Sequence, residues 1–251
     1  MKKYKYIIIA VLVVALGAGV FFPIAQSIGL FAEGNNEKYS AQYCEINKNS
    51  PIAGKTYIFL GSSVTYGSAS RGESFVDFLA KKDRIYAVKE AVSGTTLVDS
   101  GKNSYIARME GLDKNIRASA FICQLSTNDA TKKKPLGKIA EGFDKSQFDT
   151  KTVAGAIEYI IAYAQETWHC PVAFYTGTKY DSAQYEKMVN LLLDIQKKWN
   201  ISVLDLWHDE DMNKVTPENY KLYMANGIHP TRAGYKLWWL PKFESLLISL
   251  S

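Results

Sequence analysis

Four short loops of this chain carry side chains that could take part in chemistry together. A serine hydroxyl becomes a useful nucleophile only when a base takes its proton, and a histidine with a pKa near about 6.5 suits that task. Each loop taken alone also fits an ordinary turn or helix cap, because hydroxyl and amide side chains favour those positions. The loops are Gly61-Ser62-Ser63-Val64-Thr65, Ser93-Gly94-Thr95-Thr96, Ser126-Thr127-Asn128-Asp129 and Asn226-Gly227-Ile228-His229-Pro230.

A regular alternation of strands and helices is expected to position these loops. The predicted strands are short and wholly apolar. Both faces of the sheet should therefore be covered by helices, which is typical of parallel strands. The pattern predicts a three-layer α/β/α sandwich with a five-stranded parallel sheet, whose carboxyl edge gathers the loops. Strands are predicted at residues 55–60, 85–92, 120–125, 171–176 and 201–206, and helices at 74–82, 104–112, 152–168, 181–199 and 231–247.

The four loops, in this order, resemble the sequence blocks of the SGNH (GDSL-type) hydrolase family from about Lys55 to the last helix. The resemblance places the nucleophile at Ser63 in the first block and the base at His229 in the last. It also implies an oxyanion hole made by the backbone N–H groups of Ser63 and Gly94 and the side-chain amide of Asn128. The implied fold is the flavodoxin-like SGNH sandwich, and the implied activity is hydrolysis of an acyl ester without cofactor or metal.

The sequence departs from the family pattern at three positions. Ser62 stands where the first block has Asp, which leaves two adjacent serines as candidates for the attack. Ser126 stands where the third block has Gly. Asn226 stands three residues before His229, where the family has the Asp that completes the catalytic set with Ser63. An amide oxygen can accept the Nδ1–H of the histidine, but it cannot neutralise the imidazolium, and a flipped amide favours the wrong tautomer.

Two interpretations of Asn226 stay open. The site is either weakened or inactive, or another acceptor orients His229. The acidic candidates for such an acceptor follow the fifth predicted strand and are Asp205, Asp209 and Asp211.

The N-terminus is predicted to be a membrane anchor. Lys2, Lys3 and Lys5 precede a stretch without charge from residue 6 to 22, which Pro23-Ile24-Ala25 extends to roughly 20 residues, enough to span a hydrocarbon core of about 30 Å. A cleaved signal peptide is the alternative, but its apolar region is shorter and ends at a small-x-small site. We expect residues 1–25 to form a cytoplasmic N-terminus and transmembrane helix, 26–54 a polar stalk and 55–251 the SGNH-type hydrolase domain. The lysines predict that this domain lies outside the cell.

Composition excludes several classes of function. The chain has 30 Lys and Arg against 25 Asp and Glu, and no basic cluster interleaved with aromatic residues indicates a nucleic-acid surface. Three Cys and three His are too few for a disulfide framework or a multi-histidine metal centre. The expected function is a membrane-anchored extracellular serine esterase or deacylase acting on cell-envelope or extracellular carbohydrate. The alternatives are acyl transfer to a sugar hydroxyl and a non-catalytic glycan-binding surface domain; the sequence does not indicate the oligomeric state.

Overall fold

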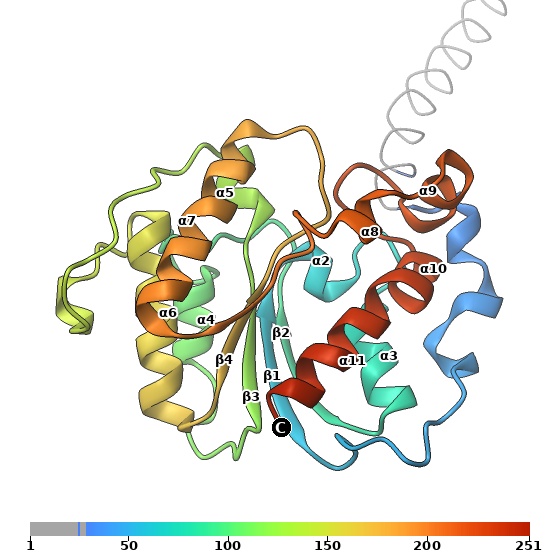
Figure 1. The fold of residues 1–251 in the computed structure, drawn as a ribbon, viewed down its shortest axis with the longest axis horizontal. Helices are drawn as coiled ribbons and strands as arrows, with labels where there is room; N and C mark the ends of the chain where they lie inside the picture. The colour runs from blue at the N-terminus through green and yellow to red at the C-terminus, as the bar shows by residue number, and fades with distance from the viewer. Residues whose placement is uncertain (1–24, 26–28) are drawn as a thin grey trace, which may run out of the picture.

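The computed structural model describes Ala25 and residues 29–251 and shows a parallel sheet between two layers of helices (Figure 1). Five strands lie in the order β2-β1-β3-β4-β5, and every neighbouring pair is parallel. The predicted α/β fold with a five-stranded parallel sheet is therefore confirmed. The strands are β1 (Thr56–Gly61), β2 (Tyr86–Ala91), β3 (Ala120–Gln124), β4 (Val172–Tyr175) and β5 (Ser202–Leu204).

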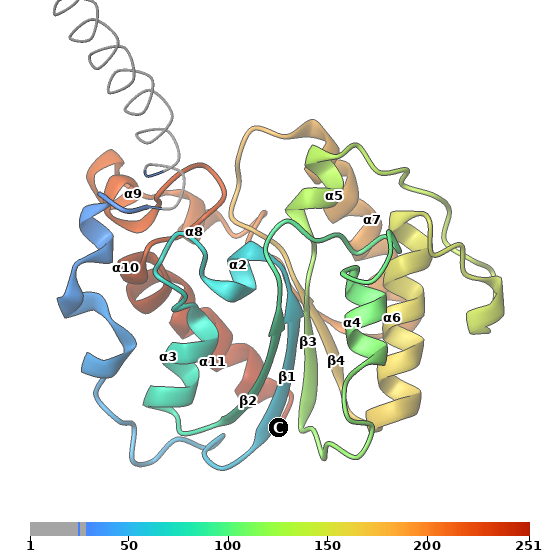
Figure 2. The same ribbon diagram turned by 180° about the vertical axis from the view of Figure 1, so that it is seen from behind.

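Helices cover both faces of the sheet, as the apolar strands predict (Figure 2). One face packs against α4 (Tyr105–Glu110), α6 (Val153–Trp168) and α7 (Ala183–Trp199), and the other against α3 (Phe75–Lys82) and α11 (Leu240–Ser249). The shorter helices are α2 (Ser63–Tyr66), α5 (Thr127–Thr131), α8 (Glu210–Asn213), α9 (Pro217–Tyr223) and α10 (Arg232–Gly234), with the short turns η1 (Glu33–Asn35), η2 (Glu37–Tyr39), η3 (Ala41–Tyr43), η4 (Lys145–Gln147) and η5 (Tyr235–Trp239).

The side chains of the central strands alternate between two buried hydrophobic clusters. In β1, Ile58 and Leu60 belong to the cluster under α4, α6 and α7, whereas Tyr57 and Phe59 belong to the cluster under α3 and α11. This alternation follows from the two-residue period of a strand. Burial on both faces fixes the register of the strands, because a slip of one residue would exchange the two sets.

The last predicted helix, at 231–247, is interrupted in the structure. It consists of α10, a π-helical turn η5 and α11. Pro241 lies at the start of α11 and has no backbone N–H to donate one turn back. The N–H of Leu240 instead donates to the carbonyl of Tyr235, which is the wider π-helical spacing.

The polar stalk predicted for residues 26–54 is not what the structure shows. Three short turns, η1 to η3, lie along the domain, and Ala41, Cys44 and Ile52 are buried in the cluster under α3 and α11. Asn35 is also buried. The segment carries few apolar residues, but those it has reach the core, so the folded unit begins before the predicted boundary at residue 55.

The transmembrane helix predicted within residues 1–25 lies outside the described residues, except for Ala25. In the part of the chain that the structure describes, no helix is both long enough and apolar enough to cross a membrane. The anchor stays a prediction.

Candidate active site

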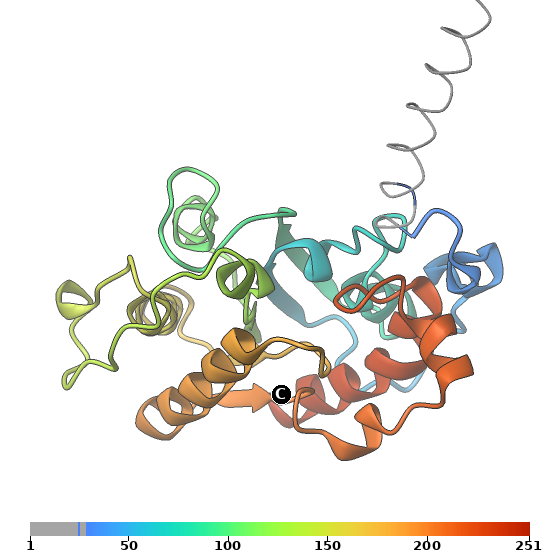
Figure 3. The same cartoon turned by 90° about the horizontal axis from the view of Figure 1, so that it is seen from above.

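The predicted site residues gather at the carboxyl edge of the sheet, which Figure 3 views from above. Ser63 is the first residue of α2, directly after β1, and Gly94 lies in the loop after β2. Asn128 lies in α5, after β3, and His229 lies in the loop between α9 and α10. Loops after adjacent parallel strands meet at this edge, which is where ligands bind in open α/β sheets.

Ser63, His229 and Asn226 form a continuous line of hydrogen-bonded side chains. The Oγ of Ser63 lies 2.8 Å from Nε2 of His229. The Nδ1 of the same ring lies 2.9 Å from Oδ1 of Asn226. Ser63 is only 8% exposed, so little water competes for its hydroxyl. The geometry is that of a hydroxyl held against a base whose far nitrogen is oriented by a third group.

The amide of Asn226 is held in the orientation that gives His229 the useful tautomer. Its Oδ1 also accepts the backbone N–H groups of Ile228 and His229, both at 3.0 Å. Because a backbone N–H can only donate, the atom it meets must be the amide oxygen. Nδ1 of His229 therefore carries the proton and donates it to Asn226, and Nε2 is left as an acceptor for the Ser63 hydroxyl.

The three acidic alternatives to Asn226 are occupied elsewhere or exposed. Asp205 accepts from Nδ1 of His208 at 2.7 Å, and Asp209 caps α8 and pairs with Lys242. Asp211 is an exposed residue of α8. Among the hydrogen bonds of the described residues, the ring of His229 bonds only Ser63 and Asn226.

Burial is the cause of a lowered pKa at His229. Desolvation holds the pKa of the imidazole below its usual value of 6.5, because the charged form loses its hydration. A neutral histidine is the form that can accept a proton from Ser63.

The two adjacent serines point to different partners. Ser62 is fully buried, and its backbone N–H donates to Oε1 of Gln124 at 2.9 Å. The same oxygen accepts the backbone N–H and the hydroxyl of Thr65, at 3.2 and 2.8 Å. Gln124 therefore ties together the turn that presents Ser63 to His229. One indication of a role for Gln124 was present in the sequence and was missed: it is a polar residue in an otherwise apolar predicted strand.

Gly61 is required by the tight packing of this turn. A Cβ on Gly61 would lie 1.7 Å from Oγ1 of Thr65, so any side chain would push the turn apart. The Thr65 hydroxyl that fills the space is also 2.6 Å from the hydroxyl of Tyr175 at the end of β4. The turn after β1 is thus fixed by contacts from both β3 and β4.

Each of the three predicted oxyanion donors has an N–H group that is free to bond a ligand or a local geometry compatible with one. The backbone N–H of Ser63 is at the first position of a helix, where no carbonyl within the helix accepts it. Gly94 has a φ of +79°, a conformation that favours glycine, and no Cβ contact would arise there within 4 Å. Nδ2 of Asn128 donates to the carbonyl of Thr95 at 2.9 Å, and an amide nitrogen has a second hydrogen for another acceptor.

Arg108, which the sequence reasoning missed, connects the loops that carry these donors. One guanidinium nitrogen donates to the carbonyl of Gly61 at 2.8 Å and to the hydroxyl of Thr95 at 3.1 Å. The other donates to the backbone carbonyl and the carboxylate of Glu90. The Arg108 side chain is 8% exposed, so these bonds are shielded from water. In the sequence, Arg108 lies within the helix predicted at 104–112, and nothing there indicates its contacts with the two loops.

Asp129 supports the same loop from below and does not face His229. Its carboxylate accepts the backbone N–H groups of Leu97 and Val98 at 2.8 and 3.1 Å. Burial raises the pKa of this carboxyl, and its hydrogen bonds oppose that shift. The carboxylate of the third loop therefore shapes the chain after Gly94.

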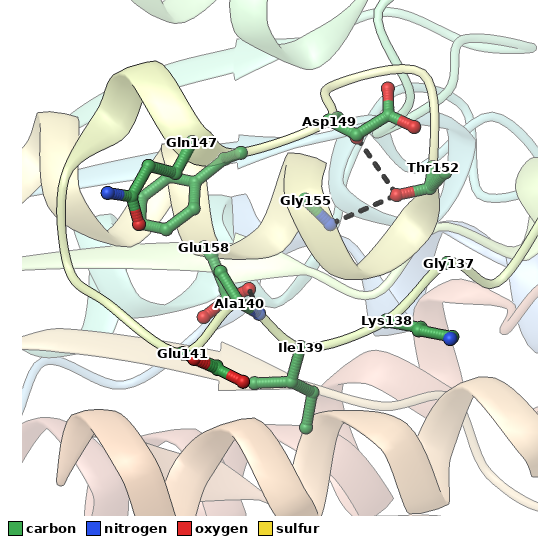
Figure 4. Close-up of a pocket in the computed structure, with 11 residues that line it drawn as sticks. Gly137, Lys138, Ile139, Ala140, Glu141, Gln147, Asp149, Thr152, Gly155 and Glu158 are labelled. Carbon is green, nitrogen blue, oxygen red and sulfur yellow. Dashed lines mark hydrogen bonds between the residues drawn. The ribbon is translucent and has the colours of Figure 1, made fainter.

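A cavity of about 500 Å³ lies away from these residues, beside the start of α6 (Figure 4). The fully buried Glu158 lines it, and its carboxylate accepts from the backbone N–H of Ala140, Nζ of Lys198 and Nε1 of Trp199. Both oxygens of the Glu158 carboxylate thus accept from donors of the surrounding loop and α7. The ion pair of Glu158 with Lys198 fastens the loop at 137–149 to α6 and α7. In the described residues, no group of three or more His, Cys, Asp or Glu is placed to hold a metal ion.

Residues 59–237 match the sequence profile of the GDSL-like lipase/acylhydrolase family. No curated protein matches the chain. Among solved structures, a protein from Lactobacillus plantarum is 20% identical with a TM-score of 0.66, over 79% of this chain and 98% of its own.

Two further structures share the fold. A candidate GDSL-like lipase from Bacteroides ovatus is 18% identical with a TM-score of 0.57, over 78% of this chain and 99% of its own. A family two carbohydrate esterase from Clostridium thermocellum, solved in complex with cellohexaose, is 15% identical with a TM-score of 0.55, over 78% of this chain and 64% of its own. With the profile covering most of the chain, the protein belongs to the GDSL-like lipase/acylhydrolase family of hydrolases.

Proposed function

We propose that this protein is a serine esterase or deacylase in which Ser63 is the nucleophile and His229 the general base. The observation that carries the proposal is the line from Ser63 Oγ through the ring of His229 to Asn226, at 2.8 and 2.9 Å. The family supports ester hydrolysis, and the line supplies the groups that the reaction needs.

The reaction follows from the protonation states of these groups. Nε2 of His229 takes the proton of the Ser63 hydroxyl while Oγ attacks the carbonyl carbon of the ester. The carbonyl π bond opens to an oxyanion, which the N–H groups of Ser63, Gly94 and Asn128 stabilise. Each such donor contributes about 3–4 kcal/mol. The imidazolium then gives its proton to the departing alkoxide, and the acyl group stays on Ser63.

Hydrolysis of the acyl-enzyme repeats these steps with water. His229 takes a proton from the water as its oxygen attacks the acyl carbon, and returns it to Ser63 Oγ as the C–O bond breaks. Asn226 orients the ring in both halves but leaves the imidazolium without a neutralising charge. We therefore expect a kcat that is low for this class of enzyme.

The substrate we propose is an acyl ester on cell-envelope or extracellular carbohydrate. The fold shared with a carbohydrate esterase that was solved with cellohexaose supports this class. The proposed location is the outer face of the cell membrane, with residues 1–25 as a single transmembrane anchor. The charge-free stretch at 6–22 behind three lysines supports that location.

Turnover of p-nitrophenyl acetate and of acetylated oligosaccharides tests the proposal. Ser63→Ala should lower kcat by at least about 10³-fold, because within residues 29–251 no other hydroxyl is held against His229. Ser62→Ala is the matched control and should keep most of the activity. Loss of activity in Ser62→Ala with retention in Ser63→Ala would overturn the assignment. An unaltered chain that binds glycans but turns over no ester would support the non-catalytic alternative.

A further inference from the structure

The chain makes contact with the domain within a few residues of the end of the apolar N-terminal stretch. The carbonyl of Ala25, its last residue, accepts the backbone N–H of Leu30 at 2.8 Å. The carbonyl of Gly29 accepts from Nδ2 of Asn35 at 2.7 Å. The same nitrogen donates to the carbonyl of Ala69, also at 2.7 Å. One buried amide thus joins the entering chain to the domain surface.

Asn35 bonds two segments that closely follow the proposed catalytic residues in the sequence. Ala69 lies six residues after Ser63, in the loop that follows α2. Oδ1 of Asn35 accepts the backbone N–H of Arg232, three residues after His229, at 2.9 Å. Asn35 is 1% exposed, so water does not compete for these three bonds. The chain therefore enters the domain beside the proposed nucleophile and base.

Further contacts make this attachment rigid. The guanidinium of Arg232 lies 2.9 Å from the carboxylate of Glu73, and both are largely buried. The same carboxylate accepts the hydroxyl of Ser40 and the backbone N–H of Ala41, at 2.8 and 3.0 Å. Figures 1 and 3 show the segment from η1 to η3, drawn in blue, beside α9 and α10.

The attachment limits how far the site can lie from a membrane. A free stalk of 29 residues would reach roughly 100 Å when extended, at about 3.4 Å per residue. The four steps from Ala25 to Gly29 reach at most about 14 Å. Leu30, Tyr66 at the end of α2 and Tyr220 in α9 are 41%, 47% and 40% exposed. Tyrosine is favoured at the boundary between lipid and water.

We propose that the carboxyl edge of the sheet, with Ser63 and His229, faces the outer surface of the bilayer and acts on acyl esters displayed at that surface. This proposal rests on the anchor and the esterase activity proposed above. It adds that the substrate is carried by a molecule held at the same membrane, within reach of a fixed site. Esters deeper in an envelope lie beyond that reach.

Fluorescence quenching by lipid measures which edge faces the membrane. The full chain is reconstituted in vesicles of phosphatidylcholine and phosphatidylglycerol that contain nitroxide-labelled lipid. Tyr66→Cys and Tyr220→Cys carry a fluorophore at the catalytic edge. Tyr86→Cys is the matched control, since Tyr86 is 68% exposed and starts β2 at the opposite edge. The native cysteines Cys44, Cys123 and Cys170 are buried, and labelling of the unaltered chain sets the background.

We expect the lipid nitroxide to quench the labels at 66 and 220 at least about twofold more than the label at 86. Equal quenching at both edges, or stronger quenching at 86, would overturn the proposal. A 15-residue helical spacer inserted after Ala25 lifts the domain by about 22 Å and should remove the difference. Quenching that survives the spacer would also overturn it.

The same samples separate the failures of the underlying assumptions. A chain that does not float with the vesicles contradicts the anchor and, with it, the proposed orientation. Hydrolysis of p-nitrophenyl acetate by the unaltered, unlabelled chain in the same vesicles reports the esterase activity without reference to the orientation. Quenching at the catalytic edge together with no turnover by the unaltered chain would support the orientation and contradict the activity.

Discussion

Asn226 shows how a single amide can replace part of what a carboxylate does. Two backbone N–H groups fix its oxygen toward Nδ1 of His229, so the orientation of the ring and its tautomer do not depend on a negative charge. What the amide cannot supply is compensation for the positive charge that His229 gains when it takes the proton of Ser63. In the proposed reaction, the amide therefore raises the free energy only of those states in which His229 is positively charged.

Asn226→Asp should therefore raise kcat. The carboxylate keeps the acceptor at the same place and adds a charge opposite to the imidazolium, and a stabilisation of about 1.4 kcal/mol in the transition state gives about tenfold in rate. We expect an increase in kcat of roughly tenfold or more, measured with p-nitrophenyl acetate, and a little-changed melting temperature. An unchanged kcat in a clearly active parent would contradict this account of His229.

The pH dependence of kcat/KM should reflect the burial of His229. Desolvation lowers the pKa of its imidazole from 6.5, so the neutral, active form persists to lower pH. We expect the acid limb of kcat/KM to have its midpoint below 6.5. Because the unfolded chain binds this proton at higher pH than the folded chain, the free energy of unfolding should fall as the pH drops below about 6.5. In Asn226→Asp the new charge raises the pKa, and a limb that fails to move upward would contradict the assignment.

The spacing of the proposed oxyanion donors depends on secondary-structure elements and not on single residues. The turn into α2 carries Ser63, and the loop after β2 carries Gly94. A guanidinium from α4 bonds both, through the carbonyl of Gly61 and the hydroxyl of Thr95. We therefore treat Arg108 as a positioning residue, because it fixes the two backbone segments that carry the proposed oxyanion donors.

Arg108→Lys should separate kcat from KM. A lysine ammonium cannot reproduce the fork that reaches two loops and Glu90 at once. We expect kcat to fall about 10- to 100-fold while KM changes less than about threefold, because the donors act mainly on the oxyanion. The matched control is Lys151→Met, whose 68% exposed side chain pairs with Asp99 on the same loop. Equal losses in both variants, or a rise in KM alone, would contradict the positioning role.

The strands and the long helices were predictable because their signals are local. Apolar runs such as residues 55–60 and 120–125 and the 3.6-residue period of 152–168 gave β1, β3 and α6 within a few residues. The helices α2 and α5 were not predicted, since four and five residues are too few to show a 3.6-residue period of apolar positions. Gln124 and Arg108 escaped for another reason: their partners come from other strands and loops, and sequence spacing does not show such contacts.

At the scale of the whole molecule, the segment before β1 is part of the folded unit. Its composition is polar, which is why it resembled a stalk, yet Ala41, Cys44 and Ile52 fill the cluster under α3 and α11. The place of the proposed site residues at the carboxyl edge of the sheet was predictable, because each follows a predicted strand or precedes the last helix. The attachment of residues 29–44 beside them was not, because it depends on the buried amide of Asn35.

Truncation should show where the folded unit begins. Removal of residues 1–28 keeps every contact of Asn35 and Ala41 in the domain and should give a soluble, cooperatively unfolding protein. Removal of residues 1–44 takes away two partners of Glu73, Ser40 and Ala41, and part of the core. We expect a melting temperature lower by about 5–10 °C, since about 1 kcal/mol shifts it by 2–4 °C in a domain of this size. Equal melting temperatures for the two fragments would show that the segment contributes nothing to stability.

The most direct test of the central claim is the site of covalent attachment by a fluorophosphonate probe on the unaltered chain, mapped by mass spectrometry of its peptides. The account predicts one adduct, on Ser63, because among the hydroxyls that the structure describes only this one bonds Nε2 of His229. It also predicts that the adduct disappears in His229→Ala. An adduct on Ser62, or no adduct in a folded protein that binds glycan, would contradict the account.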